Sequence, residues 1–132
     1  MFGTFDISTS ALVAQRIRMD AISGNVSNAW TTERADGRPG PYQRRVALFS
    51  VGDGDGGPGV HVSRIVEDPA PPRRAYDPGH PRADGNGYVA YPNVDLNVEM
   101  INMIEAVRAY EASVTALEVT KSMTSSTLRL LA

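Results

Sequence analysis

The side chains that could carry catalysis or hold a metal are few in this sequence, and their spacing fits neither task. His61 and His80 are the only histidines, and the chain contains no cysteine. Neither histidine has partners at the spacing of a zinc site or a catalytic site. Serines are plentiful, but no G-x-S-x-G nucleophile elbow occurs. We therefore expect no catalytic residue, no metal site and no cofactor.

Two glycine-rich segments imitate ligand-binding motifs without their chemistry. The glycines of segment 52–57 match G-x-G-x-x-G, but its two aspartates would repel a pyrophosphate, and Pro58 follows where a helix should open. Segments 52–57 and 84–87 also resemble calcium loops, yet neither has the spaced oxygen ligands that close on a glutamate. We interpret them as a flexible loop and a turn. The formal glycosylation sequon Asn25-Val26-Ser27 lies in a predicted helix, so we discount it.

Charge and composition exclude further classes of function. Thirteen Lys and Arg against fifteen Asp and Glu give a formal net charge of -2, which argues against a nucleic-acid binder. No run of eighteen apolar residues predicts a membrane-spanning helix. The N-terminus does not read as a secretory signal, because Asp6 stands where a basic region belongs and Arg16 interrupts the apolar stretch. By these rules we expect a cytosolic protein, unless another export route recognises it.

The length of 132 residues fits one domain, or one domain with extended arms, and glycine and proline divide it into three segments. All nine prolines lie between Pro39 and Pro92, and ten of the twelve glycines lie between Gly37 and Gly87. Because both residues oppose helix interiors, the divisions are a helical segment 1–32, a strand-and-loop segment 33–92 and a helical segment 93–132. In the middle we expect strands at 42–50, 60–67 and 87–91. Whether they form a true sheet is left open.

The N-terminal segment has the period of an amphipathic helix over residues 8–29. Its stripe alternates spacings of three and four and consists of Leu12, Gln15, Met19, Ile22, Val26 and Ala29. Ser8 and Asp6 are the two candidate caps for its start. Gly24 lies inside the pattern and weakens the helix by about 1 kcal/mol relative to alanine.

The C-terminal segment carries a longer stripe over residues 95–131, with Asn93 or Asp95 as the cap. Its members are Leu96, Met100, Met103, Val107, Tyr110, Val114, Leu117, Lys121, Thr124, Leu128 and Leu131. Ile101 and Ile104 widen the stripe in the first turns. At the standard rise the helix is roughly 55 Å long, so it must project beyond any compact domain this chain can build.

The two amphipathic ends admit three interpretations. They can form an ordinary antiparallel helix pair inside one monomer, or they can belong to a subunit whose ends are completed by neighbouring copies. A soluble coiled-coil adaptor that binds one partner helix is the third. The shorter stripe cannot cover the longer one, and exposed apolar area of that size marks an assembly surface. We favour the assembling subunit.

Several motifs, in order along the chain, resemble those of the bacterial flagellar rod proteins. Segments 5–8 and 14–19 resemble the opening of these proteins, and segment 25–32 resembles the Asn-x-x-Asn-Ala-x-Thr signature of flagellar axial proteins. Within the family, a protein of the proximal rod is indicated by the segments 66–69, 76–81, 87–89, 92–94, 109–112, 116–117 and 121–123. The resemblance covers nearly the whole chain. Trp30, where the family usually has a small or polar residue, and the acidic loop 52–57 depart from it.

The resemblance implies a non-enzymatic subunit of the flagellar basal body, exported unfolded by the type III apparatus and assembled helically in the periplasm. It implies a mainly α fold in which the two terminal helices form an antiparallel coiled coil, with a small β-rich middle segment inserted between them in the sequence. Expected partners are neighbouring copies, other proximal and distal rod proteins, the ring-to-rod adaptor and the export apparatus, with no nucleic acid and no membrane insertion. The residues we expect at interfaces are Leu12, Met19, Ile22, Val26, Asn25, Asn28, Thr32, Met100, Met103, Val107, Tyr110, Val114, Leu117, Leu128 and Leu131.

Overall fold

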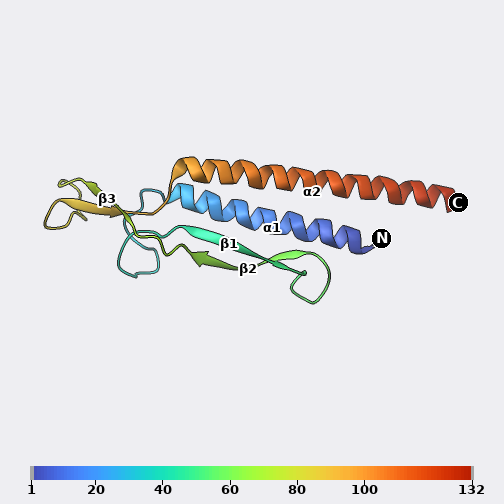
Figure 1. Ribbon diagram of the computed structural model, residues 1–132, viewed down its shortest axis with the longest axis horizontal. Coiled ribbons are helices and arrows are strands. Elements are labelled where there is room, and N and C mark those ends of the chain that lie inside the picture. The colour runs from blue at the N-terminus through green and yellow to red at the C-terminus, as the bar shows by residue number, and fades with distance from the viewer. Residues whose placement is uncertain (1, 132) are drawn as a thin grey trace.

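The computed structural model describes residues 2–131 and has a helix at each end of a β-rich middle. The helices are α1 (Phe2–Ser27) and α2 (Leu96–Leu131), and the strands are β1 (Arg45–Val51), β2 (Val60–Glu67), β3 (Arg73–Tyr76) and β4 (Tyr88–Tyr91). Figure 1 shows an elongated molecule in which α1 and α2 run antiparallel, side by side, and α1 lies between α2 and the β1–β2 hairpin. The expected mainly α fold with a small β-rich middle is confirmed, and the helix pair forms within one chain.

The middle segment forms two separate antiparallel hairpins. β1 pairs with β2 from Arg45↔Glu67 to Val51↔Val60, with a bulge between Leu48 and Phe49. β3 pairs with β4 from Arg73↔Tyr91 to Tyr76↔Tyr88. The prediction for 60–67 is confirmed, whereas β1 begins later than residue 42. Strand β3 was missed because Arg-Arg-Ala-Tyr carries no alternating apolar pattern, and only its pairing with β4 makes it a strand.

The start of α1 differs from the prediction. The helix begins at Phe2, so neither Ser8 nor Asp6 caps it, and Ser8 is buried within the helix. The physical reason is tertiary: the start of β2 docks on this part of α1, where the backbone N–H of Val60 donates to Ser10 Oγ at 3.1 Å. Gly59 permits the approach, because a Cβ there would lie 2.4 Å from Ser10 Oγ. Contact with β2 therefore supports helical turns that the local sequence does not specify.

Helix α2 matches its predicted bounds within one residue, and Asp95 is its cap. Asp95 Oδ1 accepts from the backbone N–H of Asn97 at 2.9 Å and of Val98 at 3.4 Å. Asn93, the other candidate, instead accepts from the backbone N–H of Arg44 at 3.0 Å. Because α2 has 36 residues and α1 has 26, α2 continues beyond the start of α1 and forms one end of the molecule alone (Figure 1).

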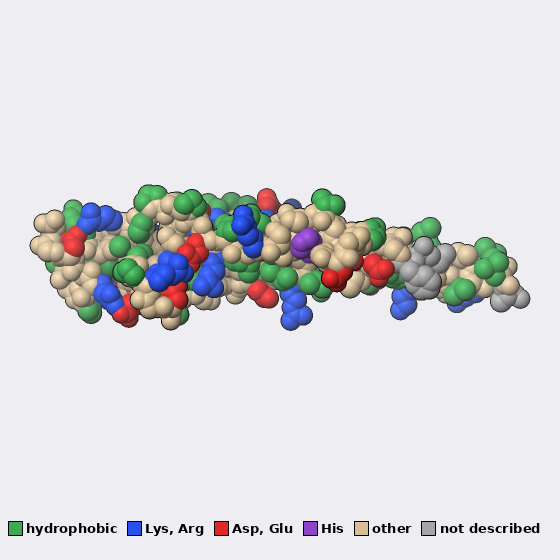
Figure 2. Space-filling view, turned by 90° about the horizontal axis from the view of Figure 1, so that it is seen from below, with side chains coloured by type: hydrophobic (Ala, Val, Ile, Leu, Met, Phe, Trp, Pro, Cys, Tyr) green, Lys and Arg blue, Asp and Glu red, His purple; other side chains and the backbone are tan. Residues whose placement is uncertain are grey.

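The apolar core is small and is spread over α1, β4 and α2 with the segments next to them. Its fully buried apolar residues are mostly short side chains, namely Ala14, Ile22, Ala29, Val89, Val94 and Ala106. Figure 2, which views the molecule from below the β1–β2 hairpin, shows acidic and basic side chains interspersed on that face, with no large area of one sign. Most large apolar side chains of α2 are left in contact with solvent.

Candidate assembly surface

A buried polar cluster fixes the end of α1 against the start of α2. Asn25 and Glu99 are both 0% exposed, and Asn25 Nδ2 donates to Glu99 Oε2 at 3.1 Å. Arg44 Nε donates to the other oxygen, Glu99 Oε1, at 2.5 Å, and a second guanidinium nitrogen lies 3.3 Å from Asp68 Oδ2. Although burial opposes its charge, the carboxylate of Glu99 raises the pKa of Arg44. We call Asn25, Arg44 and Glu99 the polar hub.

Asn25 also holds the chain that leads into β1. Its amide Nδ2 donates to the backbone oxygen of Arg45 at 2.9 Å, and its Oδ1 accepts from the Arg45 N–H at 2.8 Å. The hydroxyl of Tyr42 donates to the same Oδ1 at 2.9 Å, and burial raises the pKa of this phenol. Every polar atom of the Asn25 side chain is thus used inside the chain, which gives one residue of the Asn-x-x-Asn-Ala-x-Thr signature a folding role.

The rest of the signature ends α1 and starts the following turn. Asn28 Nδ2 donates to the carbonyl of Gly24 at 2.8 Å, which satisfies an oxygen of the last helical turn. Thr31 Oγ1 donates to Asn28 Oδ1 at 3.1 Å. Ala29 is buried, while Asn28 and Thr32 are half-buried. These positions work together as a helix stop.

Helix α2 turns a mixed face toward α1. Glu99 and Ala106 are fully buried on this face, and half-buried Met103, Tyr110 and Leu117 continue it at spacings of three and four. Arg18 of α1 donates to Glu105 across the pair at 3.2 Å. From the contact Asn25–Glu99 to the contact Arg18–Glu105, the residue number falls in α1 and rises in α2, as expected for antiparallel helices. We call this the inner face of α2.

Beside the inner face, α2 carries apolar residues that remain exposed in the part of the chain that the structure describes. Between 37% and 62% of each residue is exposed, and the set consists of Leu96, Met100, Ile101, Ile104 and Val107. They occupy the first three turns, where α1 already covers the inner face. We call them the outer stripe. A contiguous apolar strip of this kind on a small protein indicates an interaction surface.

The predicted interface residues fall on different sides of the helix pair. Ile22 and Asn25 are buried, and the half-buried members are Leu12, Met19, Asn28, Thr32, Met103, Tyr110, Val114 and Leu117. The exposed members are Val26, Met100, Val107, Leu128 and Leu131. Periodicity missed Glu99 and Arg44, the charged pair of the hub. The spacing could have indicated that Glu99 is buried, because it lies three residues after Leu96 and four before Met103, within the apolar stripe of the helix.

A second charged cluster joins the loop after α1 to the end of β2. Arg34 pairs with Glu67 and Asp36, and Arg38 pairs with the same two carboxylates. The guanidinium of Arg38, together with that of Arg34, holds the pKa of Asp36 well below its usual range. Because all four charged side chains form ion pairs with one another, we interpret the cluster as one that stabilises the conformation of the loop.

The two histidines lie at separate places in the described chain, and each contacts a neighbour in its own loop or hairpin. Among residues 2–131, no group of three or more His, Asp or Glu side chains is placed to hold a metal. His61 Nδ1 lies 2.8 Å from the carbonyl of Gly52, and the His80 ring lies edge-on to Tyr91 with centroids 6.1 Å apart. Neither of the two described helices is both long and apolar enough to span a bilayer.

Comparison with known proteins places the same segments in one group. The family model described as flagella basal body rod protein matches residues 5–34, and the model described as flagellar basal body rod FlgEFG protein C-terminal matches residues 86–130. The chain is 42% identical to the flagellar basal-body rod protein FlgC of Yersinia enterocolitica, over 98% of this chain and 97% of the relative. Identity to FlgC is 41% in Bacillus subtilis, with 92% of both chains covered, and 38% in Borreliella burgdorferi, with 99% and 97% covered.

Proposed function

This chain belongs to the FlgC family of flagellar basal-body rod proteins, and we propose that it builds the proximal part of the rod by packing its outer stripe against helices of neighbouring subunits. It is a structural subunit of the basal body, not an enzyme, and as a rod protein it contacts other rod components. The family membership replaces the adaptor interpretation.

The outer stripe is the observation that carries the proposal. Within one chain, α1 occupies the inner face of α2, while Met100 and Ile104 remain 62% and 52% exposed. Burying such residues against a partner helix is favourable by roughly 25 cal/mol for each Å² removed from water. A head-to-tail arrangement of such contacts does not close on itself and yields a helical filament, which is the symmetry a rod needs.

The proposal also covers how the protein leaves the cytoplasm and where it assembles. The protein is exported by the flagellar type III apparatus and assembles in the periplasm, between a ring-to-rod adaptor and the distal rod. There the α1–α2 pairs associate as antiparallel coiled coils, and the rod transmits torque from the rotor to the hook. Many apolar helix contacts in parallel resist sliding, because each one that slips re-exposes its apolar area to water. The β-rich middle, residues 33–92, lies outside this helical layer.

The test places a charge on the outer stripe. Ile104→Glu should leave the isolated protein folded, since an exposed substitution changes stability by only about 0.5 kcal/mol. In the rod the same glutamate would be an unpaired ion between helices, at a cost of several kcal/mol per contact. We expect normal circular dichroism and normal export but no rods in isolated basal bodies, and no motility. Ala116→Glu, at an exposed position on another side of the same helix, is the matched control and should build rods.

Leu117→Glu is a weaker test, because Leu117 continues the inner face and its substitution also disturbs the pair within one chain. Normal rods from Ile104→Glu and from Met100→Glu would show that the outer stripe is not an assembly contact. Loss of rods in Ala116→Glu alone would assign the contact to the side of α2 that carries Ala116.

A further inference from the structure

The β3–β4 hairpin stands apart from the rest of the molecule. Within the described chain, β3 and β4 pair only with each other, and one side chain of β4, Val89, is fully buried. A two-stranded hairpin is marginally stable by itself. Figure 1 nevertheless shows it projecting in line with the helix pair, at the end opposite the two termini. Side chains that bridge the gap must set this direction.

Trp30 is the largest of these bridging side chains. It follows α1 within three residues and is 62% exposed, although it is the only tryptophan in the chain. The indole lies edge-on to Tyr91 of β4, with ring centroids 5.5 Å apart and an interplanar angle of 80°. The guanidinium of Arg73 from β3 lies 4.8 Å from the indole centroid and 5.9 Å from that of Tyr91. One indole therefore contacts both strands.

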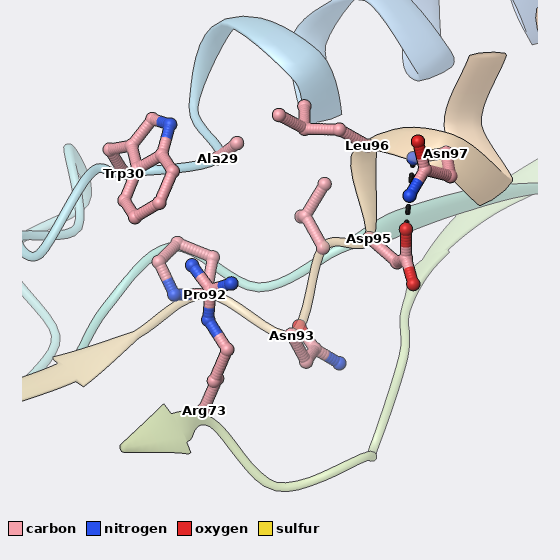
Figure 3. Close-up of a pocket in the computed structure, with 9 residues that line it drawn as sticks. Ala29, Trp30, Arg73, Pro92, Asn93, Asp95, Leu96 and Asn97 are labelled. Atoms are coloured by element: carbon pink, nitrogen blue, oxygen red, sulfur yellow. Dashed lines mark hydrogen bonds between the residues drawn. The ribbon is translucent and has the colours of Figure 1, made fainter. Parts of the chain in front are cut away.

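The base of the hairpin is held by Asn93, which accepts from the backbone N–H of Arg44 at 3.0 Å, whereas the connections farther along the hairpin are weaker. A groove of about 440 Å³, lined by Trp30, Pro92 and Leu96 among others, separates the hairpin from the start of α2. Figure 3 shows Trp30 and Arg73 on its rim, with the groove open between them and Leu96. Glu33 forms an ion pair with Arg82 across the same gap, but half or more of each side chain is exposed. Exposed ion pairs contribute little to holding two segments together.

We propose that Trp30 is a positioning residue that clamps the β3–β4 hairpin to the end of α1, so that the hairpin is an arm of fixed direction. The stack through Arg73 and Tyr91 suits this role, because cation–π and edge-to-face contacts each restrict the orientation of the rings. In the rod, the fixed arm would meet a neighbouring subunit at one angle, and this last step alone rests on the proposed function.

The experiment measures the direction of the arm in the isolated protein. Since the chain has no cysteine, Ser23→Cys on α1 and Gly85→Cys on the loop of the hairpin can carry two spin labels, both at exposed positions. Double electron–electron resonance of the full chain should give one narrow distance distribution. In Trp30→Ala and in Arg73→Ala we expect a distribution about twofold wider, because a segment with few remaining contacts samples more orientations.

Matched variants separate the clamp from its alternatives. Trp30→Phe keeps an aromatic ring and should keep a narrow distribution, and Glu33→Gln, which removes the exposed ion pair, should also stay narrow. Amide exchange at the polar hub checks that each variant is folded. If Trp30→Ala unfolds the hub, Arg73→Ala decides, since Arg73 belongs to the arm. A wild-type width in Arg73→Ala, or equal broadening in Glu33→Gln, would overturn the proposal whether or not the protein builds rods.

Discussion

The polar hub gives the sharpest prediction for the fold, through the substitution Arg44→Met. Methionine keeps the length of the side chain but removes the one cation that contacts Glu99 among residues 2–131, and the Glu99 side chain is 0% exposed. The carboxylate would keep one donor, the amide of Asn25. Breaking a buried ion pair from one side costs about 3–5 kcal/mol. Because 21% of the Arg44 side chain reaches solvent, we expect the lower end, about 3 kcal/mol.

The double variant Arg44→Met, Glu99→Leu tests the cause of that loss. With both charges removed, no ion is buried without a partner, and apolar replacement of a buried pair is often neutral or stabilising. We therefore expect the double variant to recover most of the stability, which corresponds to a coupling free energy of about 2 kcal/mol or more. The assay is urea unfolding of the purified protein followed by circular dichroism.

Arg18→Met is the matched control for the hub. Arg18 pairs with Glu105 across the same two helices, but 61% of the Glu105 side chain is exposed. Removing a pair of this kind costs about 0–1 kcal/mol. If Arg44→Met costs no more than Arg18→Met, or if the double variant is no more stable than Arg44→Met, then the hub does not hold the helices together and the reasoning from burial is refuted.

Four further outcomes follow from the described contacts. Gly24→Ala should raise the free energy of unfolding by about 0.5–1 kcal/mol, since the added Cβ would lie at an ordinary contact distance, 3.8 Å, from Tyr42 Oη. A lower free energy of unfolding in urea would mean that the helix needs glycine at this position. Gln15→Leu should raise the free energy of unfolding by about 1 kcal/mol, because Gln15 Oε1 is buried without a partner among the described residues. A lower unfolding midpoint would contradict this. Hydrogen exchange of the isolated protein should be fast in α2 after residue 122. The contacts Asn25–Glu99 and Arg18–Glu105 place the start of α1 beside residue 122, so the later residues of α2 have no helix beside them in the described chain. Equal protection along α2 would contradict this. Ion pairs hold the pKa of Asp36 below its unfolded value, so the stability they add is present above about pH 4 and is lost as the pH falls toward the folded pKa. In Asp36→Asn the free energy of unfolding should therefore fall less steeply below about pH 4 than in the wild type. An unchanged fall would show that Asp36 does not cause the loss of stability in acid.

The elements at the two ends follow from local sequence. The three–four spacing of apolar residues and the absence of proline before Pro39 and after Pro92 predict both helices, and Asp95 caps α2 as its position indicates. Strand β2 is predicted for the same kind of reason, since its β-branched residues lie between glycine and proline breakers. These features depend on neighbours within a few residues, which the sequence displays directly.

The faces and the contacts depended on the tertiary structure. Periodicity places Met100, Met103 and Val107 on one stripe, but the structure turns Met103 toward α1 and leaves Met100 and Val107 in solvent. The choice is made by the Asn25–Glu99 contact, which joins residues 74 positions apart. A buried carboxylate is stable only where a distant cation and amide meet it, and no local pattern encodes that meeting. The sequence by itself determined two amphipathic helices and a family, whereas the packing around one buried charge decided which side of α2 remains exposed.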